Sequence, residues 1–168
     1  MMRSSDDAGR RLDALDQIEA IKRLKHRYWR ACDAKDPVTF RASFIKSGAR
    51  IDYGLLGTFD DADALTEVFC QVALLTVDGS YVIFDMHHGL HPDITLTSGT
   101  TATGRWTLQF RQINLLDWTE TLMTGDYDDA YVVEEGEWKM SACIFTERWS
   151  LRRPLGDGAE LHPGTFVT

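Results

Sequence analysis

The 168-residue sequence predicts an α+β protein in which helices come first and long antiparallel strands follow. Between residues 12 and 32, apolar side chains recur every three or four positions, which is typical of one buried helix face. Over residues 101–111, apolar and polar side chains alternate, which is typical of a half-buried strand. Long strands and few helices bury one common face only if the sheet curves strongly around the helices. The expected shape is a cone with a pocket at its open end, where ligands usually bind.

Local signals place the other elements. The polar stretch over residues 1–10 is expected to be a flexible lead-in to the first helix. Asp36 and Pro37 are typical of the N-cap and first residue of a second helix. The remaining elements are expected as a short strand at 49–53, a helix at 60–76, and hairpin strands at 119–133 and 138–149.

The chain is expected to form one domain, residues 11–151, followed by an irregular tail, residues 152–168. Prolines and glycines oppose a regular element in the tail. Its apolar side chains are expected to dock and to cover the mouth of the cavity. These side chains are Leu155, Leu161, Phe166 and Val167.

Composition excludes several classes of protein. The formal net charge is −8, and nucleic-acid binding normally takes a basic surface. No apolar run approaches the ~18 to 20 residues that a membrane-spanning helix needs, and the first residues do not form a signal peptide. The 3 cysteines lie far apart, so no disulfide framework is expected and a reducing cytoplasm is the natural setting.

Several motifs are spread over roughly residues 15–150. The opening helix carries Ile18-Glu19-Ala20-Ile21-Lys22-Arg23-Leu24-Lys25, then Tyr28-Trp29-Arg30 and Asp33. Later segments are Met86-His87, Gly89, Pro92-Asp93-Ile94-Thr95, Thr100-Thr101-Ala102-Thr103-Gly104-Arg105-Trp106 and Gly136-Glu137-Trp138-Lys139-Met140. Together these segments resemble the SnoaL-like proteins of the NTF2-like superfamily. The threonine-rich segment and the Tyr-x4-Asp spacing resemble most its bile-acid 7α-dehydratase and scytalone dehydratase branch.

The resemblance implies a cone-shaped α+β barrel with an apolar cavity, no cofactor, and assembly as homodimers or homotrimers. It implies a catalytic set of a tyrosine and an aspartate from the first helix and a histidine from the first central strand. These positions fall on Tyr28, Asp33 and His87. The fourth position of the set, an acid or histidine on the next strand, falls on Phe110, which cannot transfer a proton.

The chemistry of the side chains fits this assignment. Histidine has an unperturbed pKa of ~6.5, so His87 can act as a general base near neutral pH. Asp33 would orient its ring, and the Tyr28 hydroxyl would polarise a carbonyl or assist a leaving hydroxide. From the residues alone, a structural role with satisfied hydrogen bonds is favoured for each of the three, and the resemblance reverses that order for His87.

Other residues are candidates for substrate binding: Tyr53, Arg105, Phe110 and Tyr127. Arg105 could bind an anionic group or simply face solvent. His87 and His91 have the i, i+4 spacing of helical zinc sites, but their segment is predicted as a strand, so no metal site is expected.

The sequence therefore favours a cofactor-free, dehydratase-like lyase, or a related isomerase or cyclase, acting on a small polycyclic or aromatic alcohol or ketone. The alternative is a non-catalytic ligand-binding protein, or a structural β subunit of a ring-hydroxylating dioxygenase. Self-association is expected through the outer sheet face, to which Trp106, Trp138 and Trp149 would contribute aromatic area.

Overall fold

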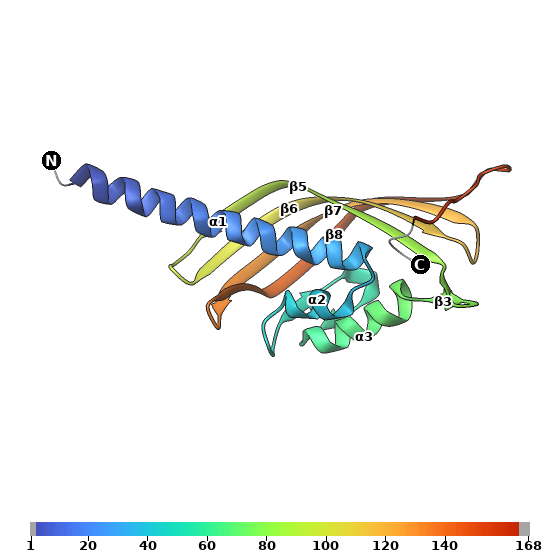
Figure 1. The fold of residues 1–168 in the computed structure, drawn as a ribbon, viewed down its shortest axis with the longest axis horizontal. Helices are drawn as coiled ribbons and strands as arrows, with labels where there is room; N and C mark the ends of the chain where they lie inside the picture. Colours follow the sequence, from blue (N-terminus) through green and yellow to red (C-terminus); the bar gives the residue numbers. More distant parts are fainter. Residues whose placement is uncertain (1–2, 165–168) are drawn as a thin grey trace.

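A computed structural model describes residues 3–164 of the chain, with helices packed on one face of a sheet (Figure 1). The helices are α1 (Arg3–Asp33), α2 (Pro37–Ala42) and α3 (Ala62–Ala73), with a 3-10 turn, η1 (Gly54–Leu56). The main sheet contains β1 (Arg50–Asp52), β2 (Thr58–Phe59), β5 (Ile83–Leu96), β6 (Thr101–Asn114), β7 (Thr119–Glu134) and β8 (Glu137–Pro154). A separate small hairpin consists of β3 (Thr76–Val77) and β4 (Ser80–Tyr81). The predicted α+β arrangement is confirmed.

Helix α1 begins earlier than the apolar pattern indicated. It is continuous from Arg3, so the expected loose lead-in over residues 1–10 is wrong for its described part. Leu12 and Leu15 are exposed, whereas Ile21 and Leu24 are buried. The reason is visible in Figure 1, where the first turns of α1 project beyond the sheet and have nothing to pack against.

The start of α2 agrees with the sequence signals. The Asp36 carboxylate accepts hydrogen bonds from the backbone N–H groups of Val38 and Thr39 at 3.0 Å each, and Pro37 follows as the first helical residue. This cap turns the chain at the end of α1, because it satisfies backbone donors that otherwise lack partners. Phe40 is thereby buried beside Tyr28, with ring centroids 5.2 Å apart.

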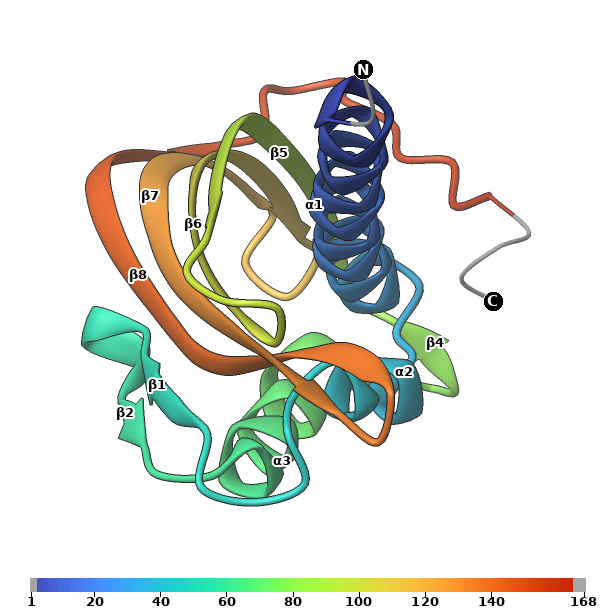
Figure 2. The ribbon, with the colours of Figure 1, turned by 90° about the vertical axis from the view of Figure 1, so that its left-hand side faces the viewer.

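The main sheet is mixed and open, with strand order β2-β1-β8-β7-β6-β5. The predicted hairpin is confirmed as β7 and β8, although β8 continues to Pro154, past the expected start of the tail at residue 152. The predicted sheet is antiparallel, and the observed one is antiparallel except for one strand. Strand β1 runs parallel to β8, and the end strands β2 and β5 do not pair within the described residues. Figure 2, with α1 nearly end-on, shows the long strands sweeping past the helices.

Strand β5 presents alternate side chains to the two faces of the sheet. Asp85, His87 and Gly89 point toward the helices, while Met86 and His88 point away. The register shifts between Leu90 and Asp93, where His91 adopts φ 52°. The bulge lies after His87, so it leaves the pairing of His87 with Phe110 on β6 intact.

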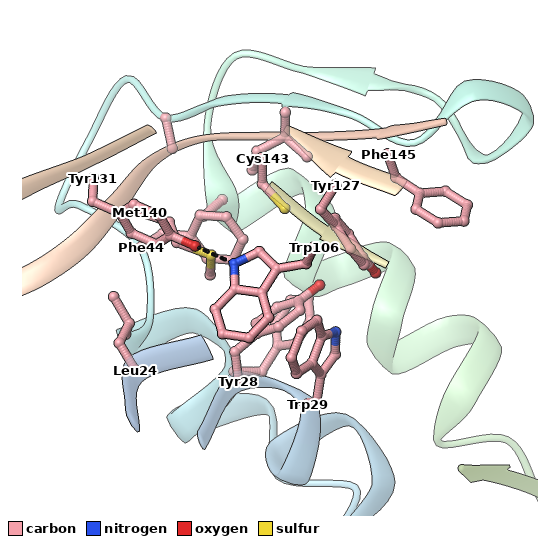
Figure 3. Packing of buried hydrophobic residues seen from close by; sticks show 14 of the residues in the cluster. Leu24, Tyr28, Trp29, Phe44, Trp106, Tyr127, Tyr131, Met140, Cys143 and Phe145 are labelled. Atoms are coloured by element: carbon pink, nitrogen blue, oxygen red, sulfur yellow. Dashed lines mark hydrogen bonds between the residues drawn. The ribbon is translucent and has the colours of Figure 1, made fainter. Parts of the chain in front are cut away.

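The core forms where α1 crosses the sheet. Figure 3 shows Tyr28 and Trp29 of α1 meeting Trp106 and Tyr127 of the sheet. Trp106 is 1% exposed, so its expected place on the outer, self-associating face is wrong. Strand alternation places it on the same face as Gly104 and Leu108, toward the helices.

Self-association stays a prediction, supported by Trp149, which is 58% exposed on β8, and by the neighbouring exposed Leu151. Light scattering at micromolar concentration should return the mass of a symmetric dimer or trimer. A mass of 19.1 kDa, that of one chain, would contradict this prediction.

Beyond Pro154, the described part of the tail has no regular element, but it does not cover the cavity. Leu155, Ala159 and Leu161 lie against the outer face of β5 and β6, beside Phe84 and Met86. The backbone N–H of Leu155 donates to the Trp118 carbonyl at 2.9 Å, and this bond directs the tail to that side. The expected lid is therefore wrong for residues 155–164; Phe166 and Val167 lie outside the described residues.

No helix in residues 3–164 is both long and apolar enough to cross a membrane.

Candidate active site

A largely apolar cavity of about 150 Å³ lies between the end of α1, α3 and the inner face of β5 and β6. Helix α3 supplies its apolar wall through Leu65, Val68, Phe69 and Val72. The polar groups come from elsewhere: His87 from β5 and three tyrosines from α1, β7 and the loop before η1. A pocket of this kind, apolar with few polar groups, is the usual form of a small-molecule site.

His87 and Asp33 form a close pair at this cavity. His87 Nδ1 lies 2.6 Å from Asp33 Oδ1, and the backbone N–H of His87 donates to Asp33 Oδ2 at 3.1 Å. The predicted contact between the two residues is thus present. Asp33 is the last residue of α1, so the end of the helix is tied at two points to β5.

The geometry of this pair defines the reactive atom of the ring. A carboxylate only accepts hydrogen bonds, so the neutral histidine donates from Nδ1 and leaves Nε2 as the basic nitrogen. Within residues 3–164, Nε2 has no hydrogen-bond partner. A histidine held in this way can take a proton from a molecule in the cavity while the aspartate stabilises the resulting positive charge.

The three cavity tyrosines keep neutral hydroxyl groups. The hydroxyls of Tyr28 and Tyr53 are hydrogen-bonded to each other, and Tyr53 Oη lies 3.4 Å from Cys143 Sγ. Burial raises the pKa of Tyr28, Tyr53 and Tyr127 well above the ordinary value for tyrosine. They can therefore donate hydrogen bonds to a bound molecule without ionising near neutral pH.

Phe110 and Arg105, two other predicted site residues, differ in position, because only Phe110 lies at the cavity. Phe110 lines the cavity, with its ring centroid 4.7 Å from that of His87. Arg105 does not approach the cavity: it faces solvent and pairs with Asp128 at 3.0 Å. Its assignment to substrate binding is wrong, because alternation on β6 sends it to the face opposite Gly104 and Trp106.

Sequence analysis missed a second polar group in the cavity. Asp85 and Gln112 line it, and Gln112 Nε2 donates to Asp85 Oδ1 at 2.9 Å. The other oxygen of Asp85 accepts from Lys35 Nζ at 2.6 Å. Asp85 lies two residues before His87 on one strand, so period-two alternation could have found it. No comparable pattern pointed to Lys35, because it lies outside any regular element, in the turn after α1, where its φ is 58°.

A fully buried ion pair under the cavity was also missed. Lys25 Nζ lies 2.8 Å from Asp129 Oδ2, 3.4 Å from Cys143 Sγ and 3.9 Å from the centroid of the Tyr127 ring. Burial, the largest single effect, would lower the pKa of Lys25, but the charge and hydrogen bond of Asp129 together with the contacts to Cys143 outweigh it, and the pKa is raised. The signal in the sequence was the position of Lys25 between Leu24 and Tyr28 on the apolar side of α1.

Cys143 connects this ion pair to the tyrosines, since its sulfur contacts both Lys25 and Tyr53. Burial raises the pKa of its thiol to about 12, so it remains protonated and polar but unreactive. Among the described residues, no group of three or more histidine, cysteine, aspartate or glutamate side chains is arranged to hold a metal ion.

The fold and this cavity define a class of protein, the small α+β domains that enclose an apolar ligand site between helices and a sheet. A family profile for the SnoaL-like domain matches residues 13–144, most of the chain. The protein belongs to this family, which is part of the NTF2-like superfamily.

Solved structures with the same fold have varied names. One from Novosphingobium aromaticivorans DSM 12444 is named "Putative Scytalone Dehydratase"; its TM-score is 0.74 at 18% identity, covering 88% of this chain and 98% of that one. The hexachlorocyclohexane dehydrochlorinase LinA-type3 from Novosphingobium barchaimii LL02 has a TM-score of 0.73 at 16% identity, covering 91% and 99%. A "Putative Aromatic Ring Hydroxylase" from Novosphingobium aromaticivorans has 0.69 at 19%, covering 80% and 91%. Likeness at these identities establishes the fold and not the reaction.

Proposed function

We propose that the protein is a cofactor-free lyase that eliminates water, or a comparable small leaving group, from a ring compound bound in the cavity. The observation that carries this proposal is the His87–Asp33 pair, with Nδ1 held at 2.6 Å and Nε2 without a partner within residues 3–164. Two of the structural relatives have names that denote eliminations, a putative scytalone dehydratase and a hexachlorocyclohexane dehydrochlorinase, and these names support the proposal.

In the proposed reaction, His87 Nε2 takes a proton from the carbon next to a carbonyl. The electron pair of that C–H bond forms a carbon–carbon double bond while the bond to the β-hydroxyl breaks. The departing hydroxide takes the proton back from His87 Nε2 and leaves as water, which returns the imidazole to its neutral form. Tyr28 or Tyr53, neutral because burial raises the pKa of each, donates a hydrogen bond to the carbonyl or to the leaving oxygen.

The cavity volume narrows the substrate class. An engineered cavity of 150 Å³ in another protein binds benzene, and this cavity has about the same volume. We therefore propose a substrate with a single six-membered ring, at the small end of the polycyclic and aromatic alcohols and ketones that the sequence suggested.

Two probes test this proposal. 3-Hydroxycyclohexanone would lose water to give 2-cyclohexenone, whose conjugated enone absorbs in the ultraviolet. Hexachlorocyclohexane, the compound named in the dehydrochlorinase relatives, would release chloride and serves as the contrasting probe without a hydroxyl group. Replacing the base with His87→Gln should lower kcat/KM by about 10² to 10⁴, the usual contribution of a general base.

The matched control is His88→Gln, which changes the adjacent histidine on the opposite, exposed face of β5 and should leave kcat/KM unchanged. If the wild-type protein turns over neither probe, or if His87→Gln retains full activity, the lyase proposal is wrong.

A non-catalytic role is the second candidate, and Phe110 is the observation that favours it. The position that the resemblance gives to an acid or histidine holds an apolar ring 4.7 Å from His87. The named ring hydroxylase relative is consistent with a role as a subunit or ligand carrier. Under this alternative, the cavity binds ring compounds, but His87→Gln changes only their affinity.

A further inference from the structure

The cavity has a second polar site that the elimination chemistry does not use. Asp85 and His87 are two residues apart on β5, and Gln112 and Phe110 are two residues apart on β6. In the sheet register, Asp85 lies opposite Gln112 and His87 lies opposite Phe110. The Asp85–Gln112 pair therefore lies one step along the cavity wall, about 7 Å from the His87–Phe110 pair.

The Asp85 carboxylate is held in place from behind. The side chains of Lys35 and Asp85 are 1% and 5% exposed, and Lys35 Nζ lies 2.6 Å from Asp85 Oδ2. A carboxylate in so little water is stable as a charge only when it is paired, and Lys35 supplies the opposite charge. Asp85 can thus remain an anionic hydrogen-bond acceptor inside a mainly apolar pocket.

Gln112 completes the set of acceptors. Its Nε2 donates to Asp85 Oδ1 at 2.9 Å, which fixes the amide and leaves its oxygen, Oε1, without a partner in the described part of the chain. Each carboxylate oxygen can also accept more than one hydrogen bond. The site therefore offers several acceptors, and the ligand group that complements acceptors is a hydrogen-bond donor.

We propose that Asp85 and Gln112 form a hydroxyl-recognition subsite that selects ring compounds bearing a hydroxyl group over apolar or halogenated rings of the same size. This inference rests on the proposed function only in taking the cavity as the binding site of a ring compound. It narrows the substrate class to alcohols and phenols, because a chlorine or methyl group in this place would leave Gln112 Oε1 buried without a donor.

Phenol and toluene are suitable probes, since they differ only by a hydroxyl in place of a methyl group. Dissociation constants for both would be measured by calorimetry or ligand-detected NMR, and their ratio taken as the phenol preference. Gln112→Met keeps the length of the side chain and removes the acceptor, so the phenol preference should fall about tenfold, the usual value of one hydrogen bond.

The matched control is Gln109→Met, on the same strand but on the opposite, exposed face, which should leave the phenol preference unchanged. A second measurement needs no variant: the Gln112 side-chain amide resonances of the wild-type protein should shift with phenol and not with toluene. A folded Gln112→Met variant with the wild-type preference, or amide resonances that respond equally to both probes, would overturn the proposal.

Failure of the subsite and failure of the lyase proposal give different results. His87→Gln should abolish turnover and leave the phenol preference intact. A phenol preference that depends on Gln112 in a protein without turnover supports the subsite and contradicts the lyase. Turnover that depends on His87, with no effect of Gln112→Met on the phenol preference, supports the lyase and contradicts the subsite.

Discussion

Replacing Lys25 with methionine is expected to lower the free energy of unfolding by about 3 to 5 kcal/mol, the usual cost of breaking a buried ion pair by removing one partner. Methionine fills a similar volume but carries no charge. It would remove the cation that lies 2.8 Å from the buried Asp129 carboxylate and leave that carboxylate to neutral donors such as the Tyr131 hydroxyl, at 2.6 Å. Urea denaturation followed by circular dichroism measures the change.

Two further variants isolate the charge. Lys22→Met, one turn earlier on α1, removes a partly exposed lysine that lies 3.6 Å from Glu19, and should cost at most about 1 kcal/mol. The double variant Lys25→Met/Asp129→Asn removes both buried charges and keeps an acceptor for Tyr131, so it should recover much of the lost stability. A Lys25→Met protein as stable as Lys22→Met would contradict this account of the core.

The pH dependence of the Lys25–Asp129 ion pair follows from the direction in which the pKa of Lys25 is shifted. The pKa of Lys25 is raised above its model-peptide value of 10.5, so the folded state holds the proton more tightly than the unfolded state. The resulting stabilisation is complete below pH 10.5 and is lost only as the pH rises through the folded-state pKa.

Gly89→Ala is expected to destabilise the protein by at least about 1 to 3 kcal/mol, the usual cost of overpacking a core. A Cβ at this position would lie 1.8 Å from an atom of the Trp29 ring. The Trp29 ring cannot readily move, because it packs at 87° and 5.2 Å against Trp106, which is itself 1% exposed. The strain would push α1 away from β5, where Asp33 reaches His87.

Gly89→Ala should therefore lower both the melting temperature of the protein and its proposed elimination activity. Gly99→Ala is the control, since a Cβ there meets nothing within 4 Å. Equal melting temperatures for the two variants would show that Trp29 has room to move and would remove the steric explanation for glycine at position 89.

Part of the candidate site followed from the chemistry of single side chains and their local spacing. The resemblance to SnoaL-like proteins assigned His87 and Asp33 together, and the structure places their side chains 2.6 Å apart. Period-two alternation divided the residues of β6 between two faces, and the same alternation on β5 puts Asp85 on the face of His87. Arg105 was misassigned because the type of a side chain does not tell which face is the inner one.

The sequence by itself determined the types and order of the elements, because helix and strand periods, caps and turns depend on residues close together in the chain. Tertiary structure alone decided the pairing of β1 with β8, the contact of Lys35 with Asp85 and the burial of Lys25 against Asp129. These partners lie 50 or more residues apart, and no local pattern fixes which distant groups meet. For the same reason, residues 155–161 of the tail, which were expected over the cavity, lie on the outer face beside Trp118 and Phe84.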